Sequence, residues 1–391
     1  MKFIVIGIAD TPRPYFPPEI LEIIRQGSVF SGGRRHRELT AGLLPREHRW
    51  IDITVPVEKV FEQYDQYGQI IVFASGDPLF YGFANTILRL RPEAGLEVYP
   101  GFNSLQMLAH RCLLPYHDLR AVSLTGRPWQ EFDRALIENA LQIGVLTDHE
   151  HTPAAIAARM LDYGYTDYRL YIGQRLGHPH EEKTFVLSPR QAAGQEFDFP
   201  NCLIVCGSHP RRYGLPDEEF ELLDGRSRMI TKMPVRLLSL QALDLPGRTC
   251  LWDIGFCTGS ISIEARLQFP HLKVEAIEIR PQGQRLMDIN ARRFGAPGIG
   301  VHIGDFLQAD LSALERPEAV FIGGHGGRLG DIMARACEYL PQGGCIVMNS
   351  VNAQSRGLFS QAAQELGLRQ EPALHIELND YHPIDILKCV K

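Results

Sequence analysis

Two acidic residues and two glycines after an apolar strand form a pattern typical of a cofactor-binding loop. Residues 252–269 read WDIGFCTGSISIEARLQF, in which Asp253 ends the strand and Gly255 and Gly259 frame a turn into a helix. Such a turn directs backbone N–H groups and a helix N-terminus at a ligand, and glycine is needed where the backbone approaches the ligand closely or takes a positive φ. Glu278 ends the next strand, about 20 residues on, the usual place for a carboxylate that binds ribose hydroxyls. The expected chemistry is therefore the binding of a nucleoside-containing cofactor.

Two cofactors fit this loop. A dinucleotide prefers the spacing G-x-G-x-x-G, whereas S-adenosylmethionine (SAM), which has no phosphate, uses a loop of the form acid-x-G-x-G-x-G. Asp253 before the first glycine fits SAM better, and Asp305 in the segment GDF (304–306) ends a third strand, where it could face the adenine amino group. The sequence predicts a SAM site across three strand ends. A nicotinamide-dependent oxidoreductase and a close-packed strand–helix turn without a ligand stay open as alternatives.

The second half of the chain supplies the elements that must position these residues. Apolar runs alternate there with amphipathic stretches, which predicts a doubly wound α/β domain that binds ligands at the carboxyl ends of its strands. The predicted strands are 250–254, 273–279, 301–305, 319–324 and 344–350, with two more near 373–379 and 384–390. The predicted helices are 229–243, 260–268, one from Pro281, 328–340 and 354–366.

The first half shows the same α/β alternation. Its predicted strands are 2–9, 69–75, 96–101, 121–126, 143–148, 168–176 and 201–206. Its predicted helices are 17–27, one near 82–91, one from about Ser104 and 152–164. Between about 207 and 228, Pro, Gly and charged residues dominate without clear apolar periodicity, which favours a domain boundary. We predict a first domain at 1–210, a linker at 211–228 and a second domain at 229–391.

Composition and charge exclude several classes of function. The chain has 391 residues, of which 45% are hydrophobic and 22% charged, as in an ordinary globular protein. A formal net charge of −6 argues against a general nucleic-acid binder. No apolar run reaches the length of about 18 residues that a membrane span needs, so no membrane partner is expected. The cysteines lack zinc-ligand spacing, so we expect no metal and interpret them as reduced thiols of a cytoplasmic protein.

Four segments of the second half resemble a known enzyme family. They are MITKMPVRLLSLQALDL (229–245), LWDIGFCTGSISIEA (251–265), EAIEIRP (275–281) and VFIGGHGG (320–327). Over residues 229–351 they resemble the CbiT-like half of the CobL family, the precorrin-6Y C5,15-methyltransferases (decarboxylating) of cobalamin (vitamin B12) biosynthesis. The resemblance implies a Rossmann-like class I SAM methyltransferase domain. The family loop usually reads D-I-G-[AC]-G-[ST]-G, from which Phe256 and Cys257 depart. The SAM contacts predicted in this half are Asp253, Gly255, Phe256, Cys257, Thr258, Gly259, Glu278, Asp305, Phe306 and Gly323.

Segments of the first half resemble the CbiE-like half of the same family, a member of the tetrapyrrole methylases. They are SGGRRHREL (31–39), ASGDPLFYG (74–82), YPGFNSLQ (99–106), SLTGRP (123–128), LTDHEHTPAAIA (146–157) and GQRLGHPHEE (173–182), in this order. The resemblance implies a two-lobed domain with SAM between the lobes, against the G-D-P loop. The family's first turn, G-x-G-P-G, is replaced here by GIADTPRPYF, where only Gly7 survives. The implied SAM contacts are Gly76, Asp77, Pro78, Leu79, Phe80, Asn103, Ser104, Leu124 and Thr125.

The resemblance also implies the reaction. A fused enzyme of this kind methylates a precorrin macrocycle at carbon 5 with its first domain. Its second domain methylates carbon 15 and removes the ring C acetate carboxyl as carbon dioxide. One SAM is expected per domain, and a homo-oligomer is expected because the family's separate halves form them. An enzyme in which only one domain is active stays open as an alternative.

Several residues are candidates for contact with the substrate, and no residue pair stands out as a catalytic base. Arg34 and Arg35 could bind carboxylates of the macrocycle through their guanidinium forks, although a solvated basic turn fits equally well. His325 and Asn349 follow neighbouring strands on the side where substrate is expected, and we take them as the candidate catalytic residues. Thr231 and Lys232, which precede the second domain, could close over its site or form an exposed cap.

Overall fold

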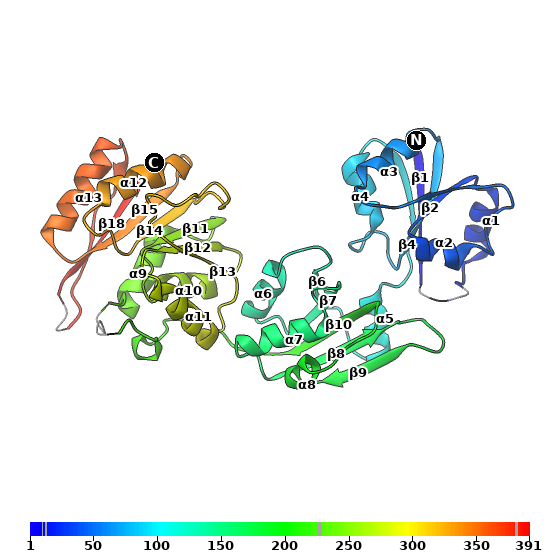
Figure 1. Cartoon of the computed structure of the whole chain (residues 1–391), viewed down its shortest axis with the longest axis horizontal. Helices are drawn as coiled ribbons and strands as arrows, with labels where there is room; N and C mark the ends of the chain where they lie inside the picture. The colour runs from blue at the N-terminus through cyan, green and yellow to red at the C-terminus, as the bar shows by residue number, and fades with distance from the viewer. Residues whose placement is uncertain (10, 12–13, 225–228, 380–381) are drawn as a thin grey trace. The chain divides into compact units, whose positions relative to one another are not determined.

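A computed structural model describes residues 1–9, 11, 14–224, 229–379 and 382–391 of the chain, which form two compact units. The N-terminal unit comprises residues 1–128, 141–158 and 167–207, and the C-terminal unit comprises 129–140, 159–166 and 208–391. Two helical segments from within the first half therefore group with the second half. Figure 1 labels the helices and strands and colours the chain by residue number.

The N-terminal unit begins with a parallel sheet in the strand order β3-β2-β4-β1-β5. Its central strand β4 has the run IIVFA, in which every side chain is buried, because helices cover both faces of a parallel sheet. The strands are β1 (Lys2–Ile8), β2 (Val29–Gly32), β3 (Arg49–Asp52), β4 (Gln69–Ser75) and β5 (Gly95–Tyr99). The helices are α1 (Pro18–Gln26), α2 (Arg34–Thr40), α3 (Glu58–Tyr64) and α4 (Phe83–Leu90).

A second, mixed sheet completes this unit in the order β6-β7-β10-β8-β9. β6 and β7 are parallel, whereas the other neighbours are antiparallel. Helix α5 packs on its apolar face through Leu105, Leu108 and Ala109. The strands are β6 (Arg120–Ser123), β7 (Gln142–Leu146), β8 (Tyr168–Gln174), β9 (Lys183–Leu187) and β10 (Asn201–Gly207). The helices of this stretch of the chain are α5 (Ser104–Cys112), α6 (Gln130–Ile137), α7 (Pro153–Asp162) and α8 (Pro189–Ala193). Of these, α6 and the end of α7 group with the C-terminal unit.

The C-terminal unit is a doubly wound sheet in the order β13-β12-β11-β14-β15-β18-β16, with β17 paired to β18. The strands from β13 to β15 are parallel, and β18 is antiparallel to β15. The chain order reverses between β11 and β14, which is where such folds bind their ligands. The strands are β11 (Cys250–Ile254), β12 (Lys273–Glu278), β13 (Ile299–Ile303), β14 (Ala319–Ile322), β15 (Cys345–Ser350), β16 (Arg369–Gln370), β17 (Leu374–Ile376) and β18 (Ile384–Val390).

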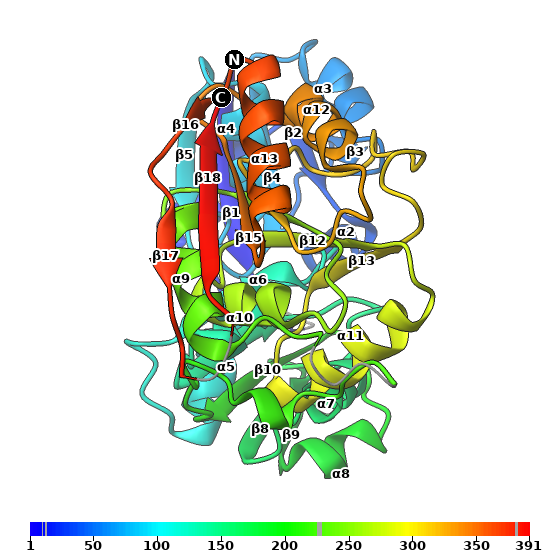
Figure 2. The same cartoon turned by 90° about the vertical axis from the view of Figure 1, so that its left-hand side faces the viewer.

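Helices cover both faces of this sheet. α12 (Leu329–Tyr339) and α13 (Ala353–Glu365) pack on one face around Trp252 and Phe359. α9 (Met233–Leu243) and α10 (Ser260–Gln268) pack on the other, and α11 (Gln282–Phe294) lies beside α10. Figure 2 shows α13 lying along β18 and β15. The α/β class predicted for both halves is confirmed.

Three features of the fold differ from the sequence predictions. Residues 34–40 form helix α2 and not a basic turn. The helix predicted from residue 229 begins only at Met233. The segment predicted as a linker carries a short 3₁₀ turn at Asp217–Glu219, and its Leu215 and Phe220 are buried at 1% and 4% exposure. Part of this segment therefore belongs to the packed core of the C-terminal unit. The domain bounds 1–210, 211–228 and 229–391 stay a prediction from the sequence.

Within the part of the chain that the structure describes, no helix is long and apolar enough to cross a membrane.

Candidate active sites

The loop between β11 and α10 is held in shape by close backbone packing. Gly255 has φ 74°, and a Cβ on it would lie 2.7 Å from the Gly324 nitrogen. Gly259 has φ 76°, and a Cβ there would lie 2.6 Å from the Met287 sulfur. Cys257 also takes a left-handed conformation, with φ 52°. Both predicted glycines are therefore required, and Cys257 already adopts the backbone geometry of the glycine that the family pattern places nearby.

Two aromatic residues predicted to contact SAM direct their rings into the core. Phe256 is 5% exposed and packs with Ile263 and Met287. Phe306 is 4% exposed and packs edge-on against Trp252. Their side chains therefore belong to the packed core of the C-terminal unit.

The two acids at the ends of β11 and β12 are both buried. Asp253 accepts a hydrogen bond from the Ser262 hydroxyl at 2.5 Å, and its buried Oδ1 has no hydrogen-bond partner among the described residues. Burial raises the pKa of Asp253 to about 7. Glu278 accepts from the Cys257 N–H at 2.9 Å and from the Arg280 N–H at 3.0 Å. Glu278 therefore joins the end of β12 to the glycine loop.

The residues of the outer rim come from β13, β14 and β15. Asp305 forms an ion pair with Arg328 at 2.8 Å, which holds the pKa of this carboxyl below its usual range. His325 accepts from the Gly327 N–H through Nδ1 at 3.2 Å, and partial burial lowers its pKa. A Cβ on Gly323 would lie 2.8 Å from the Gly255 carbonyl oxygen. The loops that follow β11 and β14 thus touch directly.

Asn349, at the end of β15, is held in a fixed orientation. Its Oδ1 lies 3.0 Å from the Ser239 hydroxyl of α9, which also donates to the Val235 carbonyl at 2.7 Å, and its buried Nδ2 has no partner among the described residues. No hydrogen bond between Asn349 and His325 is present in the described part of the chain, although their strands are neighbours in the sheet. The Asn349 amide is therefore available as a donor at this strand end.

The segment before α9 is tied to the glycine loop by side chains that sequence reasoning missed. Asn290 of α11 donates to the Thr258 carbonyl at 2.9 Å and to the Glu221 carbonyl at 3.0 Å, and accepts from the Glu221 N–H at 2.7 Å. Of the two residues predicted as a cap, Thr231 accepts from Arg236 through its carbonyl oxygen, and Lys232 lies 3.7 Å from Asp217. This segment is therefore a structural support of the loop.

A buried charge network anchors the same segment. Glu264 of α10 is completely buried and accepts from the Gly214 and Leu215 N–H groups at 2.9 and 3.0 Å. Arg236 of α9, also completely buried, donates to Glu264 at 3.1 Å and to Asp217 at 3.1 Å. Because each buried charge has a partner, the network avoids the large cost of an isolated one.

In the N-terminal unit, the G-D-P loop after β4 is also shaped by close approach. Gly76 has φ 60°, and a Cβ on it would lie 2.9 Å from the Asn103 Cα. A Cβ on Gly7 would collide with the Gly76 carbonyl oxygen, which explains why this glycine of the altered first turn is still needed. Asp77 accepts from the Leu79 N–H at 2.9 Å, so its carboxylate closes an Asx-turn.

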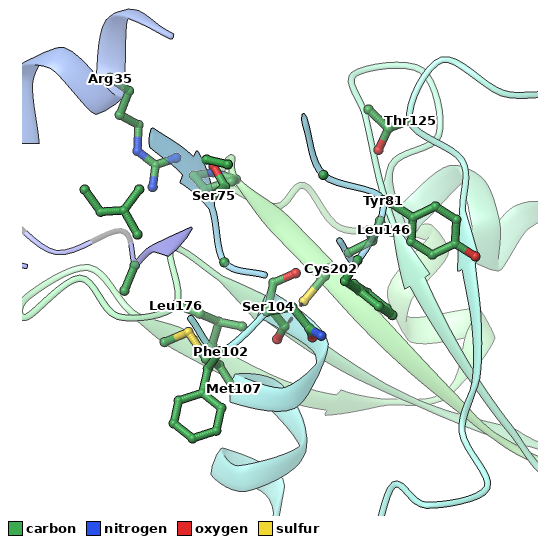
Figure 3. A pocket seen from close by; sticks show the side chains of 18 of the residues that line it. Arg35, Ser75, Tyr81, Phe102, Ser104, Met107, Thr125, Leu146, Leu176 and Cys202 are labelled. Atoms are coloured by element: carbon green, nitrogen blue, oxygen red, sulfur yellow. Dashed lines mark hydrogen bonds between the residues drawn. The ribbon is translucent and has the colours of Figure 1, made fainter. Parts of the chain in front are cut away.

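This loop opens into a cavity of about 560 Å³ that both sheets of the unit line. The volume lies within the usual range for small-molecule sites. Figure 3 shows the side chains directed into it, with Arg35 reaching in from α2 and Cys202 from β10. The predicted residues that line it are Gly76, Phe80, Asn103, Ser104, Thr125 and Arg35. The predicted residues outside its lining are Asp77, Pro78, Leu79, Leu124 and Arg34.

The neighbouring arginines of α2 have different surroundings. The Arg34 side chain is 93% exposed and pairs with Glu38 of the same helix, whereas Arg35 lines the cavity. The residues that sequence reasoning missed here include His36, Ser75, Tyr81, Phe102, Met107, Thr147, Leu176 and Asn201. His36 and Ser75 lie within segments already singled out, but nothing in the sequence shows that they meet.

Comparisons with known proteins match this two-part arrangement. Residues 4–191 match the family model of Tetrapyrrole (Corrin/Porphyrin) Methylases, and residues 223–385 match that of the Precorrin methyltransferase domain. A precorrin-6Y C(5,15)-methyltransferase [decarboxylating] of Sinorhizobium sp is 32% identical over 93% of this chain and 88% of its own length. The chain belongs to this family. It is a family of methyltransferases.

Two further relatives each correspond to one half of the chain. A cobalt-precorrin-6B C(15)-methyltransferase (decarboxylating) of Salmonella typhimurium is 35% identical over 44% of this chain and 86% of its own length. A cobalt-precorrin-7 C(5)-methyltransferase of the same organism is 28% identical over 45% of this chain and 86% of its own length. Family members thus occur both as separate halves and as a single fused chain.

Proposed function

We propose that this protein methylates carbons 5 and 15 of a precorrin macrocycle and removes the ring C acetate carboxyl as carbon dioxide. The observation that carries the proposal is the presence of two strand-end loops with left-handed glycines, one in each half. Each half matches a different methyltransferase family model. The likeness to a relative named for both methylations, over 93% of this chain, supports an enzyme with two working halves.

The two relatives that match single halves support a division of labour. The C-terminal half corresponds to a relative named for carbon 15 and decarboxylation, and the N-terminal half to one named for carbon 5. We assign the reactions accordingly. The names of these relatives, cobalt-precorrin-6B and cobalt-precorrin-7, imply that the C-terminal half acts first and passes a singly methylated, decarboxylated product to the N-terminal half.

The residues present fit one SAM in each half. In the C-terminal half, Gly255 lets the loops that follow β11 and β14 pack closely, the buried Oδ1 of Asp253 has no hydrogen-bond partner among the described residues, and Glu278 stands where ribose hydroxyls are expected. In the N-terminal half, the cavity of about 560 Å³ beside Gly76 is large enough for a small-molecule cofactor. When bound, SAM supplies an electrophilic methyl group on its sulfonium centre.

The residues of the chain would act mainly by orientation. Alignment of two reactants can supply much of a rate enhancement, and an electron-rich ring carbon needs little help from a base. Asn349, whose amide is fixed through Ser239, and His325 are the side chains proposed to contact substrate in the C-terminal half. When the bond to the ring C acetate carboxylate breaks and carbon dioxide leaves, the electron pair is delocalised over the conjugated macrocycle, and the former acetate CH2 carbon becomes a methyl group by taking up one proton.

Mass spectrometry of the product tests the function. Purified protein is incubated with labelled SAM and precorrin-6Y, or its cobalt form. A gain of two methyl groups with loss of one carbon dioxide is expected, and calorimetry should detect two SAM sites per chain. A single methyl would mean that one half is inactive. Heat on titration with NADH but none with SAM would instead favour an oxidoreductase.

A further inference from the structure

Helix α2 brings two side chains of different character to the cavity of the N-terminal unit. Arg35 and His36 both line it, next to Ser75 at the carboxyl end of β4. Figure 3 shows Arg35 directed into the cavity, with Ser75 at the end of its strand. Ser75 directly precedes Gly76, so any ligand that lies against the G-D-P loop also lies close to the Ser75 hydroxyl.

The two ring nitrogens of His36 have distinct partners. The Gly33 N–H donates to Nδ1 at 3.3 Å, and Nε2 lies 2.9 Å from the Ser75 hydroxyl oxygen. Because a nitrogen that accepts carries no proton, this arrangement assigns the ring proton to Nε2. His36 therefore donates to Ser75. Burial, together with the neighbouring Arg35, lowers the pKa of His36 to about 4, so the ring is neutral near pH 7.

The tautomer of His36 decides what Ser75 can do. A serine hydroxyl that accepts one hydrogen bond still has its own proton to donate. No acceptor for that proton is recorded among the described residues, and the hydroxyl faces the cavity. The geometry makes Ser75 a hydrogen-bond donor toward a ligand. His36 does not activate Ser75 as a base, because its Nε2 carries the ring proton and has no lone pair to accept the Ser75 proton.

A positive charge lies at the same place. Burial lowers the pKa of the Arg35 guanidinium, and so does repulsion from Arg175, which follows β8 of the other sheet. Arg175 does not line the cavity and is paired with Glu181 at 2.8 Å, so Arg35 is the cation that favours the binding of an anion there. A guanidinium fork and a hydroxyl donor together match the geometry of a carboxylate.

We propose that Arg35 and Ser75 bind a peripheral carboxylate of the tetrapyrrole, and that His36 is a positioning residue that keeps Ser75 a donor. This proposal rests on the proposed function, because it needs an acidic macrocycle in the N-terminal cavity. It adds a hydrogen-bond relay of three residues, Gly33 to His36 to Ser75, to the arginine that the sequence alone singles out.

The test uses the full-length protein and the singly methylated, decarboxylated macrocycle as substrate. Ser75→Ala and His36→Asn should each raise the KM for this substrate about tenfold, the usual effect of losing a hydrogen bond to a charged group, with kcat changed less than about twofold. His36→Gln keeps a donor near the Nε2 position and should retain most of the affinity. The double variant Ser75→Ala/His36→Asn should be no worse than either single variant, because His36 acts through Ser75.

Arg35→Ala should raise the same KM by about tenfold or more, since it removes the charge from the subsite. Arg37→Ala, on the exposed side of the same helix, is the matched control and should leave KM unchanged. If SAM affinity falls and the macrocycle KM does not, the subsite holds the methionyl carboxylate and the proposal is wrong. Additive effects of Ser75→Ala and His36→Asn would also overturn the relay.

Failure of this proposal is distinguishable from failure of the proposed function. Release of carbon dioxide by the C-terminal half should be the same in all these variants as in the unaltered protein. Unaltered protein that adds no methyl group to any precorrin would contradict the function itself. Unaltered protein that adds two, with variants that match it in KM, would contradict only the subsite.

Discussion

The loop 75–82 of the N-terminal unit and the loop 253–259 of the C-terminal unit make the same kind of turn, but different charged groups lie beside them. Each follows a buried strand, contains a glycine with φ near +60 to +75°, and leads into a helix. In the N-terminal loop, Asp77 closes its own turn and the groups that face the cavity are neutral or cationic. In the C-terminal loop, the buried carboxylates of Asp253 and Glu278 stand at the strand ends.

This difference shows that a glycine turn supplies access to a ligand, while the electrostatics come from residues elsewhere. The N-terminal site obtains its charge from α2, on another element of the unit. The C-terminal site obtains it from the last residues of its own parallel strands. Substitutions and changes of pH should therefore affect the two sites separately. Four such effects are expected, given in order of decreasing size.

Gly255→Ala should abolish the reaction of the C-terminal half and spare the N-terminal half. Its Cβ would lie 2.7 Å from the Gly324 nitrogen, and φ is 74°. We expect carbon dioxide release to fall at least about 100-fold, since small displacements in a site cost that much. Carbon 5 methylation of supplied intermediate should persist. Gly324→Ala, whose Cβ meets nothing within 4 Å, is the control. Equal loss in both halves would show that the two loops are not independent.

Glu278→Gln should weaken SAM binding in the C-terminal half by about tenfold, because it removes a charged acceptor from the Cys257 N–H. Calorimetry should then resolve one tight and one weak site per chain. Asp77→Asn is the counterpart in the other loop. It keeps an oxygen for the Leu79 N–H and should change affinity less than about twofold. Equal losses of SAM affinity in Glu278→Gln and Asp77→Asn would contradict the proposed difference between the two sites.

The stability of the C-terminal unit should fall with rising pH because of Asp253. Burial raises its pKa from 3.8 to about 7, so the folded state holds this proton more tightly than the unfolded state. The stability that it contributes is complete below pH 3.8 and is lost as the pH rises through about 7. Asp253→Asn stays neutral, so without SAM it should gain roughly 5 °C in Tm relative to the unaltered protein between pH 5 and pH 8.

The partly exposed Asp305, whose pKa is held low by Arg328, gives the control for this effect. Asp305→Asn should show no such relative gain between pH 5 and pH 8. A parallel pH dependence of Tm in the unaltered protein and in Asp253→Asn would contradict the assignment of the buried proton to Asp253.

Cys257→Gly should have the smallest effect. Cys257 already takes φ 52°, a conformation that costs a non-glycine residue about 1 kcal/mol or slightly more. Glycine removes this cost but loses more chain entropy on folding. SAM affinity should therefore change less than about fivefold, measured by calorimetry. Cys257→Val, branched at Cβ, should weaken binding more. A tightening beyond about thirtyfold would show that the cysteine distorts the loop.

Sequence reasoning worked best where burial on both faces leaves a clear pattern. The bounds of β11 and α10 match the predictions, because the apolar run CLWDI and the glycine before Ser260 mark the strand and the start of the helix. It failed for α2, whose sequence RRHRELT buries only Thr40 completely and therefore has no apolar period to detect.

Contacts between segments that are distant in the chain could not be predicted from the sequence. His36 and Ser75 are 39 positions apart, and their hydrogen bond exists only because β2 and β4 are neighbours in the sheet. The burial of Phe256 and Phe306 depends in the same way on the helices behind the loops. The prediction that Asp305 faces adenine stays open, since the structure adds a competing cation, Arg328, that the sequence does not place.

The anchoring of residues 214–221 bears on how a fused enzyme of this kind can be taken apart. A polypeptide begun at Met229 would leave the buried Glu264 without the N–H groups of Gly214 and Leu215, and Asn290 without Glu221. Each lost bond to a buried charge costs about 1 to 3 kcal/mol. A stable second half cut from this chain should therefore begin upstream of Gly214. Residues 214–221, which the sequence presents as a linker, are part of the fold that they stabilise.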